Sequence, residues 1–346
     1  MQQEFRAKTQ LCSFYTFLAA YYNYTTLSHT PEFTMPLPQN LESRLKLPVI
    51  ASPMFLVSGT DLVTQCCING VVGTFPALNQ RTSEGYREWL HTIKSTLADH
   101  PDAAPYGINL IVHKTNPRVE ADLKITVEEQ VPIVITSLGA VSELVDAVHS
   151  YGGLVFHDVT NMRHAEKAIA ANVDGLILVS AGAGGHAGTL HPFAFIEQIN
   201  REFTTCVIQS GAISNGAQVL ASRAAGADLA YMGTRFIATK ESLAEPDYKN
   251  MVIAAKAEDI VYTPKVSGIP ANFLADSLLA NGIDIKAATD PDINLGKELG
   301  DEAKAWKTIW SAGHGAGNID DNPSVATLCA RLRQEYNDGL LLLKNH

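Results

Sequence analysis

The chain has 346 residues, of which 46% are hydrophobic and 18% are charged, which is the composition of a globular protein with one large core or two domains. A formal net charge of -10 argues against nucleic acid or an anionic membrane as a partner, because both attract basic surfaces. The 5 cysteines are scattered and lack CxxC spacing, which argues against disulfides and a metal site and suits a reducing cytoplasm. We therefore expect a cytoplasmic protein that binds a small molecule.

Residues 1–34 are expected to form a loosely structured extension, with the compact protein beginning near Met35. The apolar run from Leu11 to Ala20 is shorter than the roughly 18 residues that a membrane span needs. Glu4 lies where a signal peptide would be basic, and no clear small-x-small cleavage site follows. A secretory signal is therefore not expected.

Short runs of β-branched residues alternate with helical stretches from Pro48 onward, which is the rhythm of βα units. The eight predicted strands cover 48–54, 71–75, 106–112, 131–138, 154–159, a run that begins at Gly175, 206–210 and 229–232. The predicted helices between them cover 60–68, 84–97, 118–130, 141–150, 162–171, 192–202 and 215–225. No extra strand follows to extend an open sheet, so this α/β pattern predicts a closed (β/α)₈ barrel.

The βα rhythm stops after the eighth strand. Residues 240–317 contain helical pieces at 247–257 and 273–280, and we expect them to form a mostly helical insertion that covers the barrel mouth. The barrel itself is then made of residues 35–239 and 318–346. A closing helix is predicted at 322–343, because its apolar residues are spaced along one face.

A glycine-rich turn around one histidine follows the sixth predicted strand. The apolar run from Gly175 ends in Gly184, Gly185 and His186. Glycine lets the backbone approach a bound group closely, and histidine can act as an acid or a base near neutral pH. The turn alone is also compatible with a structural role, but barrel enzymes place their active sites at the carboxyl ends of the strands. This position favours a catalytic His186.

Other strand ends carry residues suited to a ligand. Ser52 and Met54 end the first strand next to a proline, which leaves the backbone open to a flat ring, and Asn109 on the third strand can both donate and accept. Small residues follow the seventh and eighth strands, where barrels often bind phosphate with backbone N–H groups and a helix N-terminus, here near Asn215. This pair of loops predicts a phosphate-bearing cofactor.

Five segments, in chain order, resemble the nitronate monooxygenase family, also called 2-nitropropane dioxygenase-like, which comprises FMN-dependent TIM barrels. They are Ser52–Met54, Gly184–Gly188, Ser210–Gly216, Gly226–Phe236 and Trp310–Gly317. The resemblance implies FMN phosphate on Gly211, Gly233 and Thr234, and the isoalloxazine ring near Ser52, Met54 and Asn109, with Gly185 beside the flavin and His186 on its reactive side. Ser180, Ser210 and Met232 complete the implied cofactor set.

Two positions depart from the family pattern. His314 stands where the family often has glutamine, and Ala212 replaces a frequent glycine. His157 and Asp158, at the end of the fifth strand, could orient each other or approach the flavin edge, and we expect a packed or water-facing pair.

The resemblance implies oxidation of alkyl nitronates with O₂ to a carbonyl compound and nitrite, with apolar Met54, Phe75 and Phe193 suiting alkyl chains. One alternative is an NAD(P)H-dependent FMN reductase of quinones or enoyl thioesters. Another is a flavin-free barrel that binds a phosphorylated metabolite. We expect a monomer or homodimer without nucleic-acid or membrane partners.

Overall fold

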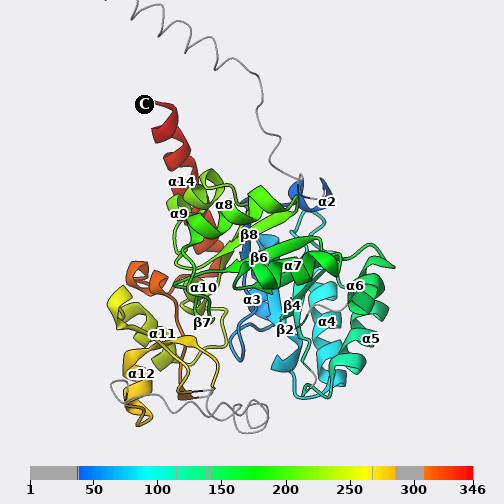
Figure 1. Ribbon diagram of the computed structural model, residues 1–346, viewed down its shortest axis with the longest axis horizontal. Helices are drawn as coiled ribbons and strands as arrows, with labels where there is room; N and C mark the ends of the chain where they lie inside the picture. The colour runs from blue at the N-terminus through cyan, green and yellow to red at the C-terminus, as the bar shows by residue number, and fades with distance from the viewer. Residues whose placement is uncertain are drawn as a thin grey trace, which may run out of the picture. The chain divides into compact units, whose positions relative to one another are not determined.

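The protein is described by a computed structural model that covers residues 37, 39–113, 115–137, 139, 142–266, 268–284 and 308–345. The expected extension at 1–34 and residues 285–307 of the expected insertion lie outside this description. Eight parallel strands form a closed barrel in the order β1-β2-β3-β4-β5-β6-β8-β9 (Figure 1), which confirms the predicted fold. Their bounds are β1 Val49–Ala51, β2 Val72–Pro76, β3 Tyr106–Ile111, β4 Ile133–Ser137, β5 Leu154–Val159, β6 Gly175–Val179, β8 Cys206–Ser210 and β9 Leu229–Met232.

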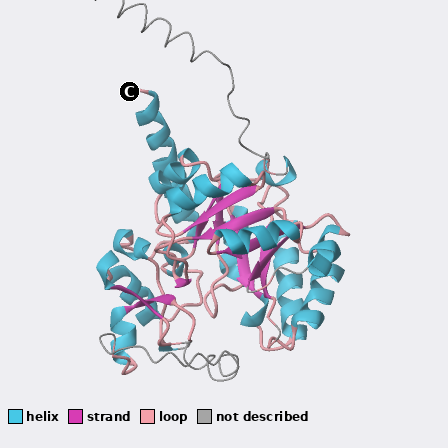
Figure 2. Ribbon diagram, viewed as in Figure 1, coloured by secondary structure: helices cyan, strands magenta, loops and turns pink. Residues whose placement is uncertain are grey.

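Helices follow the strands and cover the outside of the barrel (Figure 2). They are α3 Thr60–Ile68, α4 Ser83–Ala98, α5 Val119–Glu128, α6 Ser142–His149, α7 Met162–Ala170, α8 Pro192–Glu202, α9 Gly216–Ala224, α10 Thr234–Ile237 and the closing helix α14 Val325–Lys344. The short helix α2 Gln39–Glu42 precedes β1, and its Leu41 packs with the inward-facing residues of the barrel. Several helices begin at a side chain that accepts a hydrogen bond from the first turn, as Thr82, Asn161 and Ser324 do for α4, α7 and α14. None of the helices in the described part of the chain has the length and apolarity that a bilayer crossing requires.

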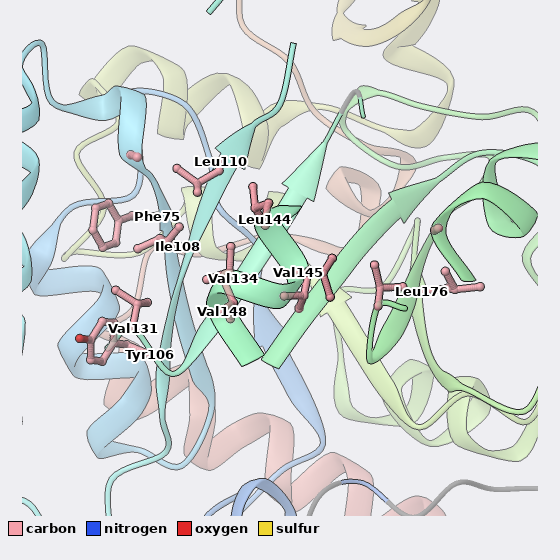
Figure 3. Packing of buried hydrophobic residues seen from close by; sticks show 14 of the residues in the cluster. Phe75, Tyr106, Ile108, Leu110, Val131, Val134, Leu144, Val145, Val148 and Leu176 are labelled. Atoms are coloured by element: carbon pink, nitrogen blue, oxygen red, sulfur yellow. The ribbon is translucent and has the colours of Figure 1, made fainter. Parts of the chain in front are cut away.

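Alternation along the strands divides the core into two layers. Residues such as Ile135, Phe156 and Ile177 point into the barrel and pack on one another. Their neighbours along the strands, including Val134 and Leu176, point outward and pack against the helices (Figure 3). The same alternation decides which polar residues at the carboxyl ends of the strands reach the interior of the barrel.

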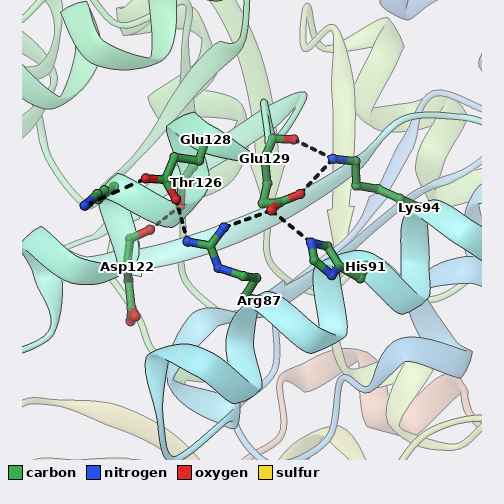
Figure 4. Close-up of polar contacts among 8 residues, drawn as sticks. Arg87, His91, Lys94, Asp122, Thr126, Glu128 and Glu129 are labelled. Atoms are coloured by element: carbon green, nitrogen blue, oxygen red, sulfur yellow. Dashed lines mark hydrogen bonds and ion pairs between the residues drawn. The ribbon is translucent and has the colours of Figure 1, made fainter.

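A carboxylate joins two of the outer helices. Glu129, at the end of α5, accepts hydrogen bonds from Arg87 (3.0 Å), His91 (2.9 Å) and Lys94 (2.9 Å) of α4 (Figure 4). Burial pulls the pKa of Glu129 upward, but the bonds from Lys94 and His91 outweigh it and lower this pKa to about 2. The cluster therefore holds α4 and α5 together through an ionised carboxylate.

The segment after β9 differs in part from the expected helical insertion. It contains α11 Pro246–Ala254, the 3₁₀ turn η2 Ala257–Asp259, α12 Ala275–Ala280 and the 3₁₀ turn η3 His314–Asn318, but also two strands, β10 Ile260–Thr263 and β11 Ala271–Leu274. The helix expected from residue 273 begins at Ala275, because Phe273 and Leu274 belong to β11. The strands pair with each other, and β11 also pairs with the two-residue strand β7 Gly185–His186. A partner so distant in sequence could not be read from local periodicity.

Candidate active site

The insertion is tied to the barrel mouth, by which we mean the carboxyl ends of the barrel strands and the loops that follow them. The side-chain amide of Asn272 donates to the carbonyl of Ala183 at 2.6 Å, in the loop after β6. The backbone N–H of Gly313 donates to the hydroxyl of Thr234 at 2.9 Å, after β9, and Ser214 donates to the carbonyl of Gly315 at 2.8 Å, after β8. These bonds hold three mouth loops and the insertion in one arrangement.

His186 lies in β7, where it pairs with Ala271 of the insertion. Its side chain is exposed to solvent, but the surrounding protein lowers its pKa below 6.5 by desolvation. The imidazole is therefore neutral at pH 7 and can accept a proton. Gly185 has φ +69°, and the nearest atom to a methyl group placed there would be Ser311 Oγ at 4.0 Å, so the approach beside His186 is open.

Two glycines at the mouth leave no room for a side chain. A Cβ at Gly211, which has φ +125°, would lie 2.9 Å from the carbonyl oxygen of Ala181. A Cβ at Gly233 would lie 2.6 Å from Ser52 Oγ and 3.7 Å from Met54 Sδ. Ser52, Met54 and Gly233 therefore lie together in one corner of the mouth.

The loops after β8 and β9 have the donors that a phosphate group needs. Within the described residues, the backbone N–H groups of Ala212 and Thr234 donate to no protein acceptor. The hydroxyl of Thr234 accepts from Gly313, which leaves its own hydrogen available. The start of α9 is different, because the N–H of Gly216 donates to Glu335 Oε2 at 2.7 Å. The residues present thus fit an anion held by the loops, and the expected contribution of this helix terminus is reduced by the chain's own carboxylate.

Ala212 adopts a conformation that suits glycine. Its φ is +56°, in the left-handed region, and its Cβ lies close to Gly182. The ring of His314 approaches the same point, with Nδ1 3.1 Å from the position of a Cβ added at Gly182. Both departures from the family pattern therefore meet at one glycine of the loop after β6.

A hydrogen-bond chain crosses three neighbouring strands on the inner wall of the mouth. Asn109 of β3 donates both amide hydrogens, to the carbonyl of Ile135 at 3.2 Å and to Ser137 Oγ at 2.8 Å. Ser137 of β4 then donates to Asp158 Oδ2 of β5 at 2.7 Å. Because the carbonyl of Ile135 can only accept, the amide of Asn109 is oriented by its partners and presents Oδ1 as an acceptor to a ligand.

Sequence reasoning missed Ser137 and placed Asp158 with the wrong partner. His157 and Asp158 are consecutive in a strand and point to opposite faces. His157 faces the helices, shares a hydrogen bond with Thr136 at 2.6 Å, and burial lowers its pKa to about 4. Asp158 faces the barrel interior, and burial raises its pKa to about 6 against the opposing bond from Ser137. Ser137 lies two residues after the inward-facing Ile135, and Asp158 lies two residues after the inward-facing Phe156. The alternation of side chains along a strand could therefore have identified both polar residues as inward-facing.

Other candidate residues lie behind the mouth surface. Ser180 is fully buried, and its hydroxyl donates to the carbonyl of Leu178 at 3.2 Å, while its N–H donates to the carbonyl of Ser210 at 3.1 Å. Met232 packs outward against the helices and offers its carbonyl to the N–H of Ser52 at 2.9 Å. These side chains are placed to support the ligand residues rather than to contact a ligand.

One of the apolar residues expected at the mouth does not lie there. Phe75 points outward and packs on Tyr86 and Trp89 of α4, because it falls on the helix-facing side of β2. Phe193, in the first turn of α8, is 56% exposed and contacts the ring of His191. Of the three, Met54 is the residue that stands beside the candidate ligand residues Ser52 and Gly233.

The chain is similar to known proteins over most of its length. A family model described as nitronate monooxygenase matches residues 40–335. The nitronate monooxygenase of Paraburkholderia phytofirmans is 26% identical over 350 residues, covering 86% of this chain and 94% of that protein. A (3aS,4S,5R,7aS)-5-hydroxy-7a-methyl-1-oxo-octahydro-1H-indene-4-carboxyl-CoA dehydrogenase of Rhodococcus jostii is 26% identical over 232 residues, covering 67% and 64%. The crystal structure of a nitroalkane oxidase from Streptomyces ansochromogenes has the same fold, with a TM-score of 0.75, 22% identity and coverage of 88% and 99%.

Proposed function

Because the chain belongs to the nitronate monooxygenase family, we propose that this oxidoreductase uses FMN to oxidise alkyl nitronates with O₂ to a carbonyl compound and nitrite. The family match carries the proposal, since residues 40–335 include all eight barrel strands, β7 and the insertion that pairs with it. The arrangement of His186 beside an open glycine adds support, because a neutral nitroalkane must lose its α-proton to a base before it can be oxidised.

FMN would supply the electron-accepting ring, and the protein's residues would bind and orient it. The N–H groups of Ala212 and Thr234 and the hydroxyl of Thr234 are the donors proposed for the phosphate. Gly211 and Gly233 let the backbone approach it closely. Asn109 offers an acceptor for an N–H group of the ring.

His186 is the proposed base. A neutral nitroalkane must lose its α-proton before it can be oxidised, and a neutral imidazole with a lowered pKa can accept that proton at Nδ1 or Nε2. Met54 gives the site an apolar side suited to an alkyl chain. A nitronate supplied as the anion needs no base, so it separates the proton transfer from the oxidation.

Anaerobic absorbance spectra test the proposal. The purified protein is saturated with FMN, and excess FMN is removed. Propyl nitronate is added to one oxygen-free sample and NADH to another. Bleaching of the bound flavin by propyl nitronate, with nitrite formed after air is admitted, is the expected result. Protein that retains no flavin absorbance after this loading would refute the proposal and favour the flavin-free barrel.

An NAD(P)H-dependent reductase of quinones or enoyl thioesters is the second candidate. The relative from Rhodococcus jostii favours it, because its name describes a dehydrogenase of a CoA thioester. Rapid anaerobic bleaching by NADH or NADPH together with no response to propyl nitronate would select this activity over the first.

A further inference from the structure

Asp158 is a carboxyl group in the wall of the barrel mouth with one oxygen satisfied and one not. Oδ2 accepts the hydroxyl hydrogen of Ser137 at 2.7 Å. Oδ1 is enclosed and meets no donor within the described residues, although the residue as a whole keeps some exposure. A carboxylate oxygen enclosed without a donor is unfavourable, because its charge has lost hydration and gained no hydrogen bond in return. Protonation of the carboxyl group relieves that cost.

Among the described residues, the elements around Asp158 bring no compensating charge. Ser137 of β4 and Asn109 of β3 are neutral, and Ile177 is the register partner on β6. Tyr231 of β9 faces the carboxyl group across the interior, and burial together with the charge of Asp158 raises the pKa of the phenol, so it stays neutral. No cationic side chain in the described ranges lowers the pKa of Asp158, which burial raises to about 6.

We propose that Asp158 is a second proton-exchanging residue of this site, which takes up one proton from solvent when a flat ring covers the barrel mouth and holds it while the ring stays bound. The inference rests on the proposed function, because the ring is that of FMN. The step is a protonation alone: solvent water or buffer releases H⁺, and the carboxylate becomes a carboxylic acid. A ring laid over the mouth removes the remaining hydration of the group, and this favours the neutral form.

Proton uptake makes FMN binding depend on pH. Above the pKa of the free carboxyl group, each pH unit should weaken FMN binding about tenfold, until the pKa of the covered group is passed. As pH falls below the pKa of the free group, which is about 6, the carboxyl group becomes mostly protonated before FMN binds, and this contribution to the pH dependence should fade. His157 on the opposite side of β5 does not share the effect, because it bonds to Thr136 behind the wall.

The experiment is a calorimetric titration of apoprotein with FMN, at pH 5.5 and 7.5, in pairs of buffers that differ in ionisation enthalpy. The number of protons bound is compared between the wild type, Asp158→Asn and the matched control His157→Gln. We expect the wild type and His157→Gln to take up about one proton more than Asp158→Asn at pH 7.5, and to show little difference from it at pH 5.5. The ionisation of the FMN phosphate, near pH 6, is common to all three and cancels in the comparison.

Equal proton numbers for the wild type and Asp158→Asn at pH 7.5 would overturn the inference while leaving the proposed function standing. Absence of FMN binding to the wild type at either pH would instead refute the proposed function. If Asp158→Asn does not fold, Ser137→Ala provides the test. Removing the donor that lowers the pKa of Asp158 should move the pH range of proton uptake upward, and an unchanged range would contradict the inference.

Discussion

Gly233→Ala is a small change at the proposed phosphate corner, and its effect can be worked out from the structure. The φ of Gly233 is -105°, which alanine adopts without strain, so the cost is steric. The added methyl group would lie 2.6 Å from Ser52 Oγ, well inside van der Waals contact. The backbone of Ser52 is held by burial and by the hydrogen bond from its N–H to the carbonyl of Met232 at 2.9 Å, so the clash is relieved only if the Ser52 hydroxyl rotates. Overpacking of this kind costs about 1–3 kcal/mol.

Thermal unfolding and FMN titration of a double-mutant cycle check this reasoning. Gly233→Ala should lower Tm by about 1–2 °C for each kcal/mol lost. Adding Ser52→Ala removes the clashing oxygen, and the double variant should regain at least about 1 kcal/mol relative to the sum of the single changes. Affinity for FMN should stay weak in the double variant, because the methyl group still occupies the space that we propose for the phosphate. Unchanged Tm in Gly233→Ala, or strict additivity in the cycle, would refute the steric argument.

Three further variants extend the test to the base, the outer helices and the mouth loop. His186→Asn should slow turnover of a neutral nitroalkane about 10²–10⁴-fold while sparing a preformed nitronate, in steady-state assays; equal loss on both would contradict the role as base. Glu129→Gln should cost about 1–2 kcal/mol at pH 6.5 in urea unfolding, once the exposure of its partners is allowed for. Because the pKa of Glu129 is lowered, this stabilisation is complete above about pH 4.5 and is lost as pH falls toward 2. The free energies of unfolding of the variant and the wild type should therefore converge in acid, and a difference that stays constant with pH would contradict the role of Glu129. Ala212→Gly should raise stability by up to about 1 kcal/mol, because it relieves a left-handed alanine, and a lower Tm would show that this backbone is not strained.

Much of the mouth could be predicted from local patterns, and the failures have a common cause. Small residues at strand ends indicate Gly233 and Ser52, and in the structure a Cβ added at Gly233 would lie 2.6 Å from Ser52 Oγ. Phe75 was misplaced because the side on which a strand residue points depends on barrel closure, not on hydrophobicity. Asp158 was paired with its sequence neighbour for the same reason, although a strand sends consecutive side chains to opposite faces.

The order of strands and helices and the closed barrel follow from the sequence alone, because eight β-branched runs alternate with helical stretches, and both are local signals. The glycine turn that carries His186 was visible in the same way. Only the tertiary structure decided that this turn forms a strand with residues 271 and 272 of the insertion, and that Asn109, Ser137 and Asp158 make one hydrogen-bond chain. Pairing of distant segments and the inward or outward direction of a side chain are settled by closure of the whole barrel, and no local stretch of residues encodes them.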